Sequence, residues 1–220
     1  MTASAAKDRC RVIVFARAPE PGKVKTRLIP ALGEAGAAAL HRRLVMHSLR
    51  AATDAQLGPV EPWCAPDTGD PFFRECERRF GVSLRSQGEG DLGARMRRAF
   101  EAVLARASHA ILVGSDIPAL SAQYLRDAER ALSGGDDVAI GPAEDGGYVL
   151  IGLSRCDAEL FREIPWGGPE VLPGTRRRVA ALRWRLSELP TLWDLDRLED
   201  LQRLPEEIRE SFIALRGSAS

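Results

Sequence analysis

The fold is decided by residues 11–28, which read RVIVFARAPEPGKVKTRL. Residues 11–16 form a run rich in β-branched side chains, which is typical of a strand buried on both faces of a parallel sheet. Gly22 then allows a tight turn. The cations that follow are Lys23, Lys25 and Arg27. This stretch therefore predicts a buried strand that ends in a basic loop.

The rest of the chain alternates strand-like and helical patterns. Further strands are predicted at 60–64, 82–85, 110–113, 138–140, 148–153 and 184–189. Helices are predicted at 34–55, 71–80, 92–106, 121–132, 158–164, 170–181 (interrupted at Pro173 and Gly174) and 198–215 (broken near Pro205). This rhythm predicts a three-layer α/β/α, Rossmann-like fold with a mostly parallel sheet, in which 138–140 and 148–153 could be an antiparallel pair.

Composition limits the classes of function. With 220 residues, 45% of them hydrophobic, the chain can bury one core, so we expect one domain at 10–215 with flexible tails at 1–9 and 216–220. Equal numbers of basic and acidic residues, 31 each, argue against broad nucleic-acid binding. No apolar run reaches the ~20 residues that a membrane helix needs, and no signal sequence is present. The four cysteines fall singly, as expected for free thiols in a reducing cytoplasm.

The basic loop is a candidate phosphate-binding site. In parallel sheets, ligands bind beyond the carboxyl ends of the strands, and cations beside backbone N–H groups suit phosphates. The loop is not a Walker A sequence, because the position five before Gly22 is Arg17. The alternative is a solvated basic turn. The candidate substrate-binding residues here are Arg17, Pro21, Gly22, Lys23, Lys25 and Arg27, with Lys25 also a candidate catalytic residue.

A carboxylate that follows the 110–113 strand is the candidate metal ligand. Asp116 lies in Gly114-Ser115-Asp116-Ile117-Pro118, and Ser115 is a candidate substrate contact. Mg²⁺ and Mn²⁺ bind one or two protein carboxylates together with substrate phosphates. Asp194 is the preferred second ligand. Asp196 could instead cap the last helix, with Glu199 completing a capping box.

Three further segments supply candidate substrate contacts. Residues 141–148 carry Asp145 or Glu144 as a candidate base, beside glycines that would let a sugar or acceptor approach the backbone, although Asp-Gly could be a plain hairpin turn. Residues 88–93 match GxGxxG but follow the third predicted strand, so a loop over a nucleotide is favoured over a dinucleotide fingerprint. Residues 166–168 resemble a mobile flap, whose tryptophan could equally be a core aromatic. The contacts expected from these segments are Gly90, Asp91, Arg95, Gly146, Gly147, Tyr148 and Trp166.

The order of these motifs resembles a known family. PxPGxVKTRL, GSDxPxL, GPAxDGGYxLIGL, IPW and DxDxxEDL follow one another from about residue 12 to 201, as in the bacterial DUF2064 family, also labelled rSAM/selenodomain-associated transferase 1. One departure is Arg197-Leu198, where the family usually has Thr-Pro. The resemblance implies a GT-A-type nucleotide-diphospho-sugar transferase fold. It also implies that Asp116 binds metal on the nucleotide phosphates and that Lys25 and Arg27 hold those phosphates.

Two enzymatic reactions and one binding role remain open. Glycosyl transfer from a nucleotide sugar and nucleotidyl transfer to a phosphorylated acceptor would use nearly the same residues and Mg²⁺ or Mn²⁺. The absence of a longer glycine-rich first loop of the LxGGxGxRxG type favours glycosyl transfer. A third alternative is a nucleotide-binding protein without turnover. The expected partners are a nucleotide or nucleotide sugar and a small-molecule acceptor, and a homodimer is left open.

Overall fold

The computed structural model describes residues 7–204 and 206. The strands are β1 (Asp8–Arg17), β2 (Val60–Ala65), β3 (Arg85–Ser86), β4 (Ala107–Val113), β5 (Val138–Pro142), β6 (Tyr148–Leu153) and β7 (Leu186–Glu188). The helices are η1 (Thr26–Leu28), α1 (Ile29–Asp54), α2 (Pro71–Phe80), α3 (Leu92–Leu104), α4 (Ala122–Ser133), η2 (Ala158–Phe161), α5 (Val171–Ala181) and α6 (Leu198–Gln202). The predicted tails at 1–6 and 216–220, and the predicted helix over 207–215, lie outside the described residues.

The strands form one sheet in the order β3-β2-β1-β4-β6-β5-β7. Strand β6 is antiparallel to both of its neighbours, and every other pair is parallel. The predicted mostly parallel sheet is therefore confirmed, as is the antiparallel pair of β5 and β6. The chain moves outward from β1 in both directions, so the strand order reverses between β1 and β4. Ligands of open α/β sheets bind at this point.

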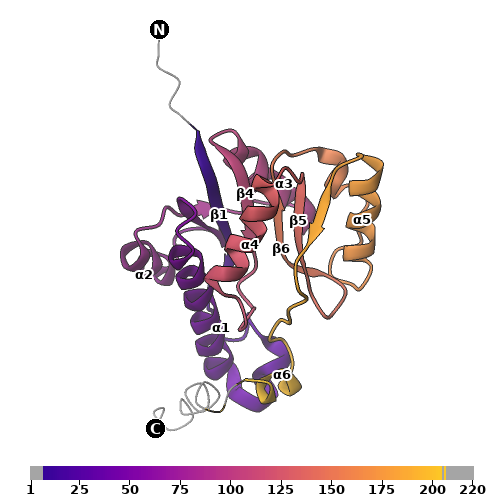
Figure 1. Ribbon diagram of the computed structural model, residues 1–220. Coiled ribbons are helices and arrows are strands. Elements are labelled where there is room, and N and C mark those ends of the chain that lie inside the picture. Colours follow the sequence, from indigo (N-terminus) through magenta and orange to yellow (C-terminus); the bar gives the residue numbers. More distant parts are fainter. Residues whose placement is uncertain (1–6, 205, 207–220) are drawn as a thin grey trace.

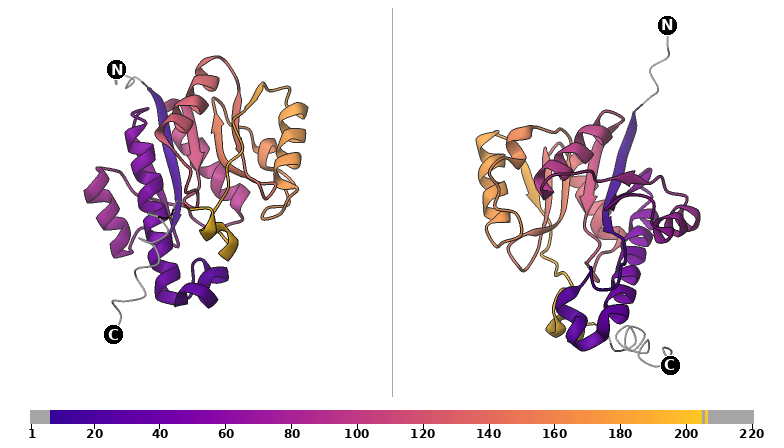
Figure 2. Two further views of the ribbon diagram at one scale, coloured as in Figure 1. Left: turned by 60° about the horizontal axis from the view of Figure 1, so that its bottom comes forward. Right: turned by 180° about the vertical axis from the view of Figure 1, so that it is seen from behind.

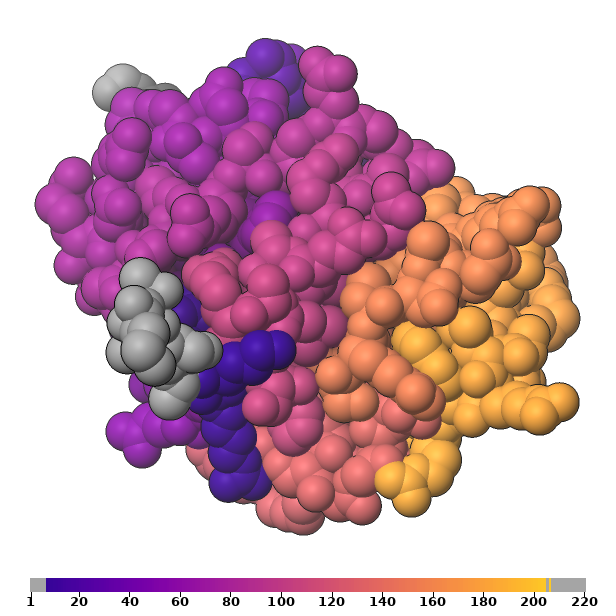
Figure 3. Space-filling model, turned by 90° about the horizontal axis from the view of Figure 1, so that it is seen from above, coloured from indigo at the N-terminus to yellow at the C-terminus, as the bar shows by residue number. Residues whose placement is uncertain are grey.

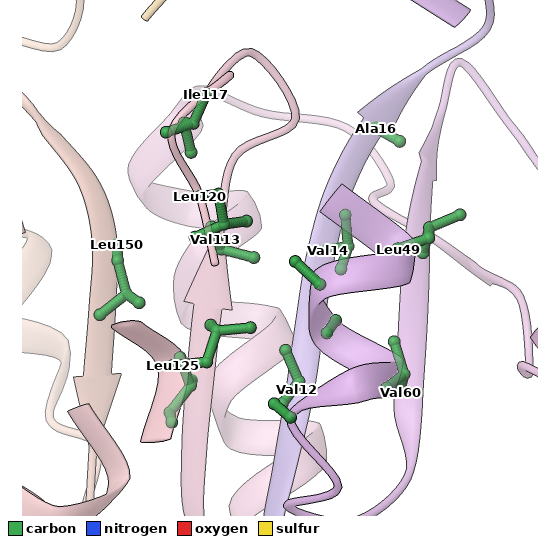
Figure 4. Close-up of a cluster of buried hydrophobic side chains, with 14 of the residues drawn as sticks. Val12, Val14, Ala16, Leu49, Val60, Val113, Ile117, Leu120, Leu125 and Leu150 are labelled. Carbon is green, nitrogen blue, oxygen red and sulfur yellow. The ribbon is translucent and has the colours of Figure 1, made fainter. Parts of the chain in front are cut away.

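Helices cover both faces of the sheet (Figures 1 and 2). On one face, Val12 and Val14 of β1 belong to a buried cluster that includes side chains of α1, α2 and α4. Figure 4 shows this cluster with Leu49 of α1 and Leu125 of α4. On the other face, Ile13 and Phe15 pack in a cluster that includes residues of α3, η2 and α5. Strand β1 is thus buried on both faces, which explains why its sequence is an apolar run and does not alternate. The three-layer α/β/α prediction is confirmed.

Several elements differ from the prediction. Helix α5 is continuous through Pro173, which lies in its first turn, where a helix does not need the missing N–H group. Helix α1 begins at Ile29 and contains Gly33 at φ 71°, where the helix kinks. Strand β1 begins at Asp8, within the predicted tail. The segments expected at 82–85 and 158–164 are a strand at 85–86 and a short 3₁₀ helix at 158–161.

The last described segment crosses the carboxyl ends of the central strands. The N–H of Leu192 donates to the carbonyl of Pro142 at 3.0 Å, and the N–H of Leu195 donates to the carbonyl of Asp116 at 2.8 Å. Leu195 is buried in a cluster of leucines from η1, α1 and the α6 region, and Figures 1 and 2 show α6 beside the start of α1. The crossing brings Asp194 and Asp196 to the edge where β1 and β4 end.

The opposite end of the sheet carries the amino end of β1, drawn in indigo in Figure 3. The loops singled out from the sequence follow β1 and β4 or join β5 to β6, so they lie at the other end. The basic loop, residues 114–118 and residues 141–148 therefore share one edge of the sheet. Within the described residues, none of the helices has the length and hydrophobicity needed to span a bilayer.

Candidate functional site

A buried lysine lies at the centre of the edge where β1 and β4 end. Lys25 ends the loop after β1 in a left-handed conformation (φ 47°, ψ 41°), which is uncommon for a residue with a side chain. Its side chain is only 3% exposed, and its Nζ lies 3.0 Å from Asp116 Oδ2 and 3.8 Å from Asp196 Oδ1. Because a buried ammonium group needs a counter-charge, these two carboxylates hold Lys25 in place.

Asp116 is held from three sides at the end of β4. Its Oδ2 lies beside Lys25, its carbonyl accepts the bond from Leu195, and its Oδ1 lies 3.4 Å from His41 Nδ1. His41 Nε2 lies 3.0 Å from the carbonyl of Arg17, which fixes the ring. Burial would raise the pKa of the Asp116 carboxyl, but the neighbouring His41 ring and Lys25 ammonium lower it to about 2. The carboxyl group is therefore ionised at neutral pH.

One cavity collects most of the residues predicted to bind phosphates. We call it the basic cavity; it has a volume of about 560 Å³. Its basic lining residues are Arg17, Lys23, Lys25, Arg27, His41 and Arg95, and its carboxylates are Asp116 and Asp196. Arg27 pairs with Asp196 at 2.5 Å, whereas Lys23 pairs with Glu20 at 2.5 Å. The predicted meeting of the basic loop with Ser115 and Asp116 is thus found in the structure.

The basic cavity also has uncharged lining residues. Phe15, Ala65 and Leu92 line it together with Gln87, which is 6% exposed. The amide of Gln87 donates to the carbonyls of Ala16 (3.2 Å) and Trp63 (2.8 Å), so that its orientation is set by the backbones of β1 and β2. The cavity therefore offers apolar side chains and a fixed amide in addition to its charged groups.

A second cavity, which we call the acidic cavity, adjoins the first and has a volume of about 320 Å³. It shares Leu92, Gly114, Ser115 and Asp116 with the basic cavity. Its other predicted site residues are Asp145, Gly147, Tyr148, Trp166 and Asp194. Burial, and after it the charge of Asp145, raise the pKa of Asp194.

Glu144 is engaged elsewhere. Arg203 donates to both of its carboxylate oxygens, at 2.7 and 2.8 Å, and the guanidinium also lies 4.3 Å from the centre of the Trp193 ring. The hydrogen bond from Arg203 lowers the pKa of Glu144. Asp145 differs, because only its Oδ1 accepts a bond within the described chain, from the N–H of Gly147 at 2.9 Å. Of the two candidate bases, Asp145 has the available oxygen.

Several predicted contacts shape the site without lining either cavity. Gly22 turns the loop at φ 79°, next to the exposed Pro21. Asp91 was expected to point inward, but its carboxylate accepts from the N–H of Ala94 at 2.8 Å and caps α3. The carbonyl of Gly90 accepts from Arg95 at 2.9 Å. Gly146, at φ 89°, leaves room for the backbone of Pro169, which would lie 2.6 Å from an added Cβ.

Sequence reasoning missed His41, Gln87 and the role of Asp196 in the site. His41 belongs to the buried stripe of α1 with Ala37, Leu44 and Val45, so a polar residue on an apolar helix face was its signal. Asp196 does not cap α6. The N-cap is Arg197, and Asp200 accepts its backbone N–H at 2.7 Å. This leaves the Asp196 carboxylate free for Lys25 and Arg27.

The donors present fit a hard divalent cation. Asp116 Oδ1 is buried and has no hydrogen-bond partner among the residues that the structure describes. Asp194 lines the same acidic cavity and provides a second carboxylate. In that described part no group of three or more His, Cys, Asp or Glu side chains is arranged to hold a metal. Protein carboxylates completed by substrate phosphates and water are the arrangement that Mg²⁺ favours.

Comparison with known proteins places the chain in a family. Residues 48–168 match the family model DUF2064, described as an uncharacterized protein conserved in bacteria. A protein from Desulfovibrio desulfuricans G20, provisionally described as a nucleotide-diphospho-sugar transferase, is 32% identical. The match covers 96% of this chain and 91% of that one, with a TM-score of 0.80. A search of the curated proteins found no match.

More distant structures share the fold. CMP:2-keto-3-deoxy-manno-octonic acid synthetase complexed with CTP is 14% identical over 94% of this chain and 99% of its own, with a TM-score of 0.53. Rv0371c from Mycobacterium tuberculosis H37Rv, in complex with manganese, is 18% identical over 91% and 98%, with a TM-score of 0.51. The predicted GT-A-type fold is confirmed. The chain belongs to the DUF2064 family and has the α/β fold of the nucleotide-diphospho-sugar transferases.

Proposed function

We propose that the protein is a metal-dependent glycosyltransferase that uses a nucleotide-diphospho-sugar. The observation that carries the proposal is the pair of Lys25 and Asp116, 3.0 Å apart at the wall of the basic cavity. A cation for phosphate and a carboxylate for the metal on that phosphate are thereby side by side at the β1/β4 switch point. The relative from Desulfovibrio desulfuricans supports the same class of substrate.

The charged and the uncharged lining residues of the basic cavity would contact different parts of the donor. Lys25 and Arg27 would leave their carboxylate partners to bind the diphosphate oxygens and would stabilise the charge that develops as the sugar departs. Phe15, Ala65 and Gln87 would contact the nucleoside. Asp116 and Asp194 would hold Mg²⁺ or Mn²⁺, which when bound neutralises charge on the leaving diphosphate.

Nucleotidyl transfer is the alternative, since it would use the same loop and carboxylate. The loop between β1 and η1 covers only residues 18–25 and contains the single glycine Gly22, which favours glycosyl transfer. Thermal unfolding with Mg²⁺ separates the two, using UDP-, GDP- and CDP-sugars and free nucleoside triphosphates as ligands. We expect at least one nucleotide sugar to raise Tm by at least about 5 °C at 100 times its Kd, and EDTA to reduce this shift. Stabilisation by triphosphates but by no nucleotide sugar would contradict the proposal.

The position of Asp145 predicts that it removes the proton from the acceptor hydroxyl. Asp145→Asn should lower kcat by about 10², because the amide cannot accept this proton. Glu144→Gln, the neighbouring control, should change kcat less than about threefold, because Glu144 is already bound by Arg203. Steady-state transfer assays at saturating donor measure both variants. Equal losses in the two variants would remove Asp145 from this role.

A further inference from the structure

The two adjoining cavities differ in charge. Arginines, lysines and a histidine line the basic cavity. The acidic cavity has no Lys, Arg or His in its lining among the residues described, and three carboxylates, Asp116, Asp145 and Asp194, face it. A bound divalent cation on Asp116 and Asp194 would balance those two charges, and Asp145 would still be uncompensated. A phosphate or carboxylate on the acceptor would therefore find no cationic side chain in this cavity.

The acidic cavity also has apolar lining residues. These residues, which we call the apolar wall, include Trp166, Leu92, Tyr148 and Val171, and Leu92 is unusual among the described residues in being a large apolar side chain that is 43% exposed. Leu92 lines both cavities, and its exposure is explained if a bound ligand covers it.

The aromatic part of this wall is positioned by a glycine. A Cβ added to Gly93, at the start of α3, would lie 2.6 Å from Trp166 Nε1, so the indole lies directly on the helix backbone. Pro169, which directly follows the flap, packs against Gly146 at a distance that excludes a side chain on Gly146. The indole ring of Trp166 is thus held in one position. It can stack on the apolar face of a sugar or on an aromatic ring.

We infer that the acidic cavity binds the acceptor, and that this acceptor is an uncharged or cationic hydroxyl compound with an apolar face. The inference rests on the proposed function for its donor. The acceptor hydroxyl would lie toward Asp145 and its apolar face against Trp166 and Leu92. The same charges disfavour an anionic acceptor, such as a phosphorylated sugar, inside the acidic cavity. Three arginines, Arg27, Arg197 and Arg203, line a third cavity that shares Asp145 and Asp194 with it.

Matched hexoses test the charge preference. Saturation-transfer NMR with the Mg²⁺-loaded protein, with and without a nucleoside diphosphate, would compare phenyl β-glucoside, glucosamine and glucose 6-phosphate. We expect phenyl β-glucoside or glucosamine to bind at least roughly tenfold more tightly than glucose 6-phosphate. Asp145→Asn should reduce the ratio between the affinity for these two hexoses and the affinity for glucose 6-phosphate. Equal or tighter binding of glucose 6-phosphate, or binding of none of the three, would overturn the inference.

Matched tryptophan variants test the apolar wall. Trp166→Ala should weaken phenyl β-glucoside about fivefold, whereas Trp184→Ala, which removes a ring paired with Arg155 outside both cavities, should not. Trp166→Phe should restore part of the loss, which separates stacking from misfolding. Equal effects of Trp166→Ala and Trp184→Ala would also overturn the inference. Calorimetric titration of the nucleoside diphosphate tests the donor independently. If the nucleoside diphosphate does not bind, the proposed donor is contradicted, and the hexose measurements without nucleotide still test the acceptor inference.

Discussion

Replacement of Asp116 by asparagine is expected to lower the rate of transfer by about 10³. The amide keeps the shape of the side chain but loses the charge that would hold the metal in the proposed function and that compensates Lys25, whose ammonium is 3.0 Å away. Metal-dependent binding of the nucleotide should fall with it. Turnover and isothermal titration of the nucleotide, each with Mg²⁺ and with EDTA, measure the two effects.

The control for this variant is Asp127→Asn. Asp127 is an aspartate of α4 that pairs with Arg130 and lies outside both cavities. It should leave turnover and nucleotide binding within about twofold of the unmodified protein. If Asp116→Asn binds nucleotide with unchanged metal dependence, both enzymatic reactions lose their central residue. A protein that binds nucleotide and shows no turnover in the unmodified form would support the third alternative, a binding protein.

Replacement of Lys25 by methionine is expected to lower kcat/KM by about 10³, because a cation aimed at a leaving diphosphate contributes most in the transition state. Methionine fills a similar volume in the buried site, and the left-handed backbone is about as unfavourable for methionine as for lysine. The substitution therefore measures the effect of removing the charge. The variant should have a lower kcat as well as a higher KM. Single-turnover rates and equilibrium titration with a nucleoside diphosphate separate the two contributions.

Lys23→Met is the matched control, since the same substitution is made two residues away in the same loop. Lys23 has a side chain that is 70% exposed and pairs with Glu20, so its removal should change kcat/KM less than about threefold. If both variants lose activity equally, the loop acts through its overall charge. That result would contradict a specific role for the buried ammonium.

The fold was largely predictable because local patterns and tertiary structure agree. The apolar run of β1 predicted a strand buried on two faces, and the structure packs Val14 and Phe15 on opposite sides of it. The errors arose where a local rule depends on position within an element. A proline breaks a helix when it lies in the interior but is tolerated in the first turn. The sequence alone did not show that α5 begins at Val171, which places Pro173 in the first turn.

The candidate site was predictable in its motifs and unpredictable in its pairings. Lys25, Asp116 and Asp145 come from loops at strand ends, which the alternation of elements places at one edge. His41 reaches Asp116 from a helix, and Asp196 reaches Lys25 from a segment far along the chain. Such contacts depend on how α1 and residues 189–196 pack over the sheet. No spacing within a single motif encodes them.

The resting site balances its own charges. Lys25 has Asp116 as its nearest counter-ion and Arg27 has Asp196, so two cations and two carboxylates cancel at the edge of the sheet. An anion entering alone would leave carboxylates uncompensated, and a metal ion entering alone would leave an ammonium uncompensated. A ligand that brings both a cation and an anion leaves no side chain uncompensated, because each carboxylate then pairs with the metal ion and each cationic side chain pairs with the anion. On the proposed function, such a site would favour a metal and a nucleotide that arrive as one complex over either ion alone.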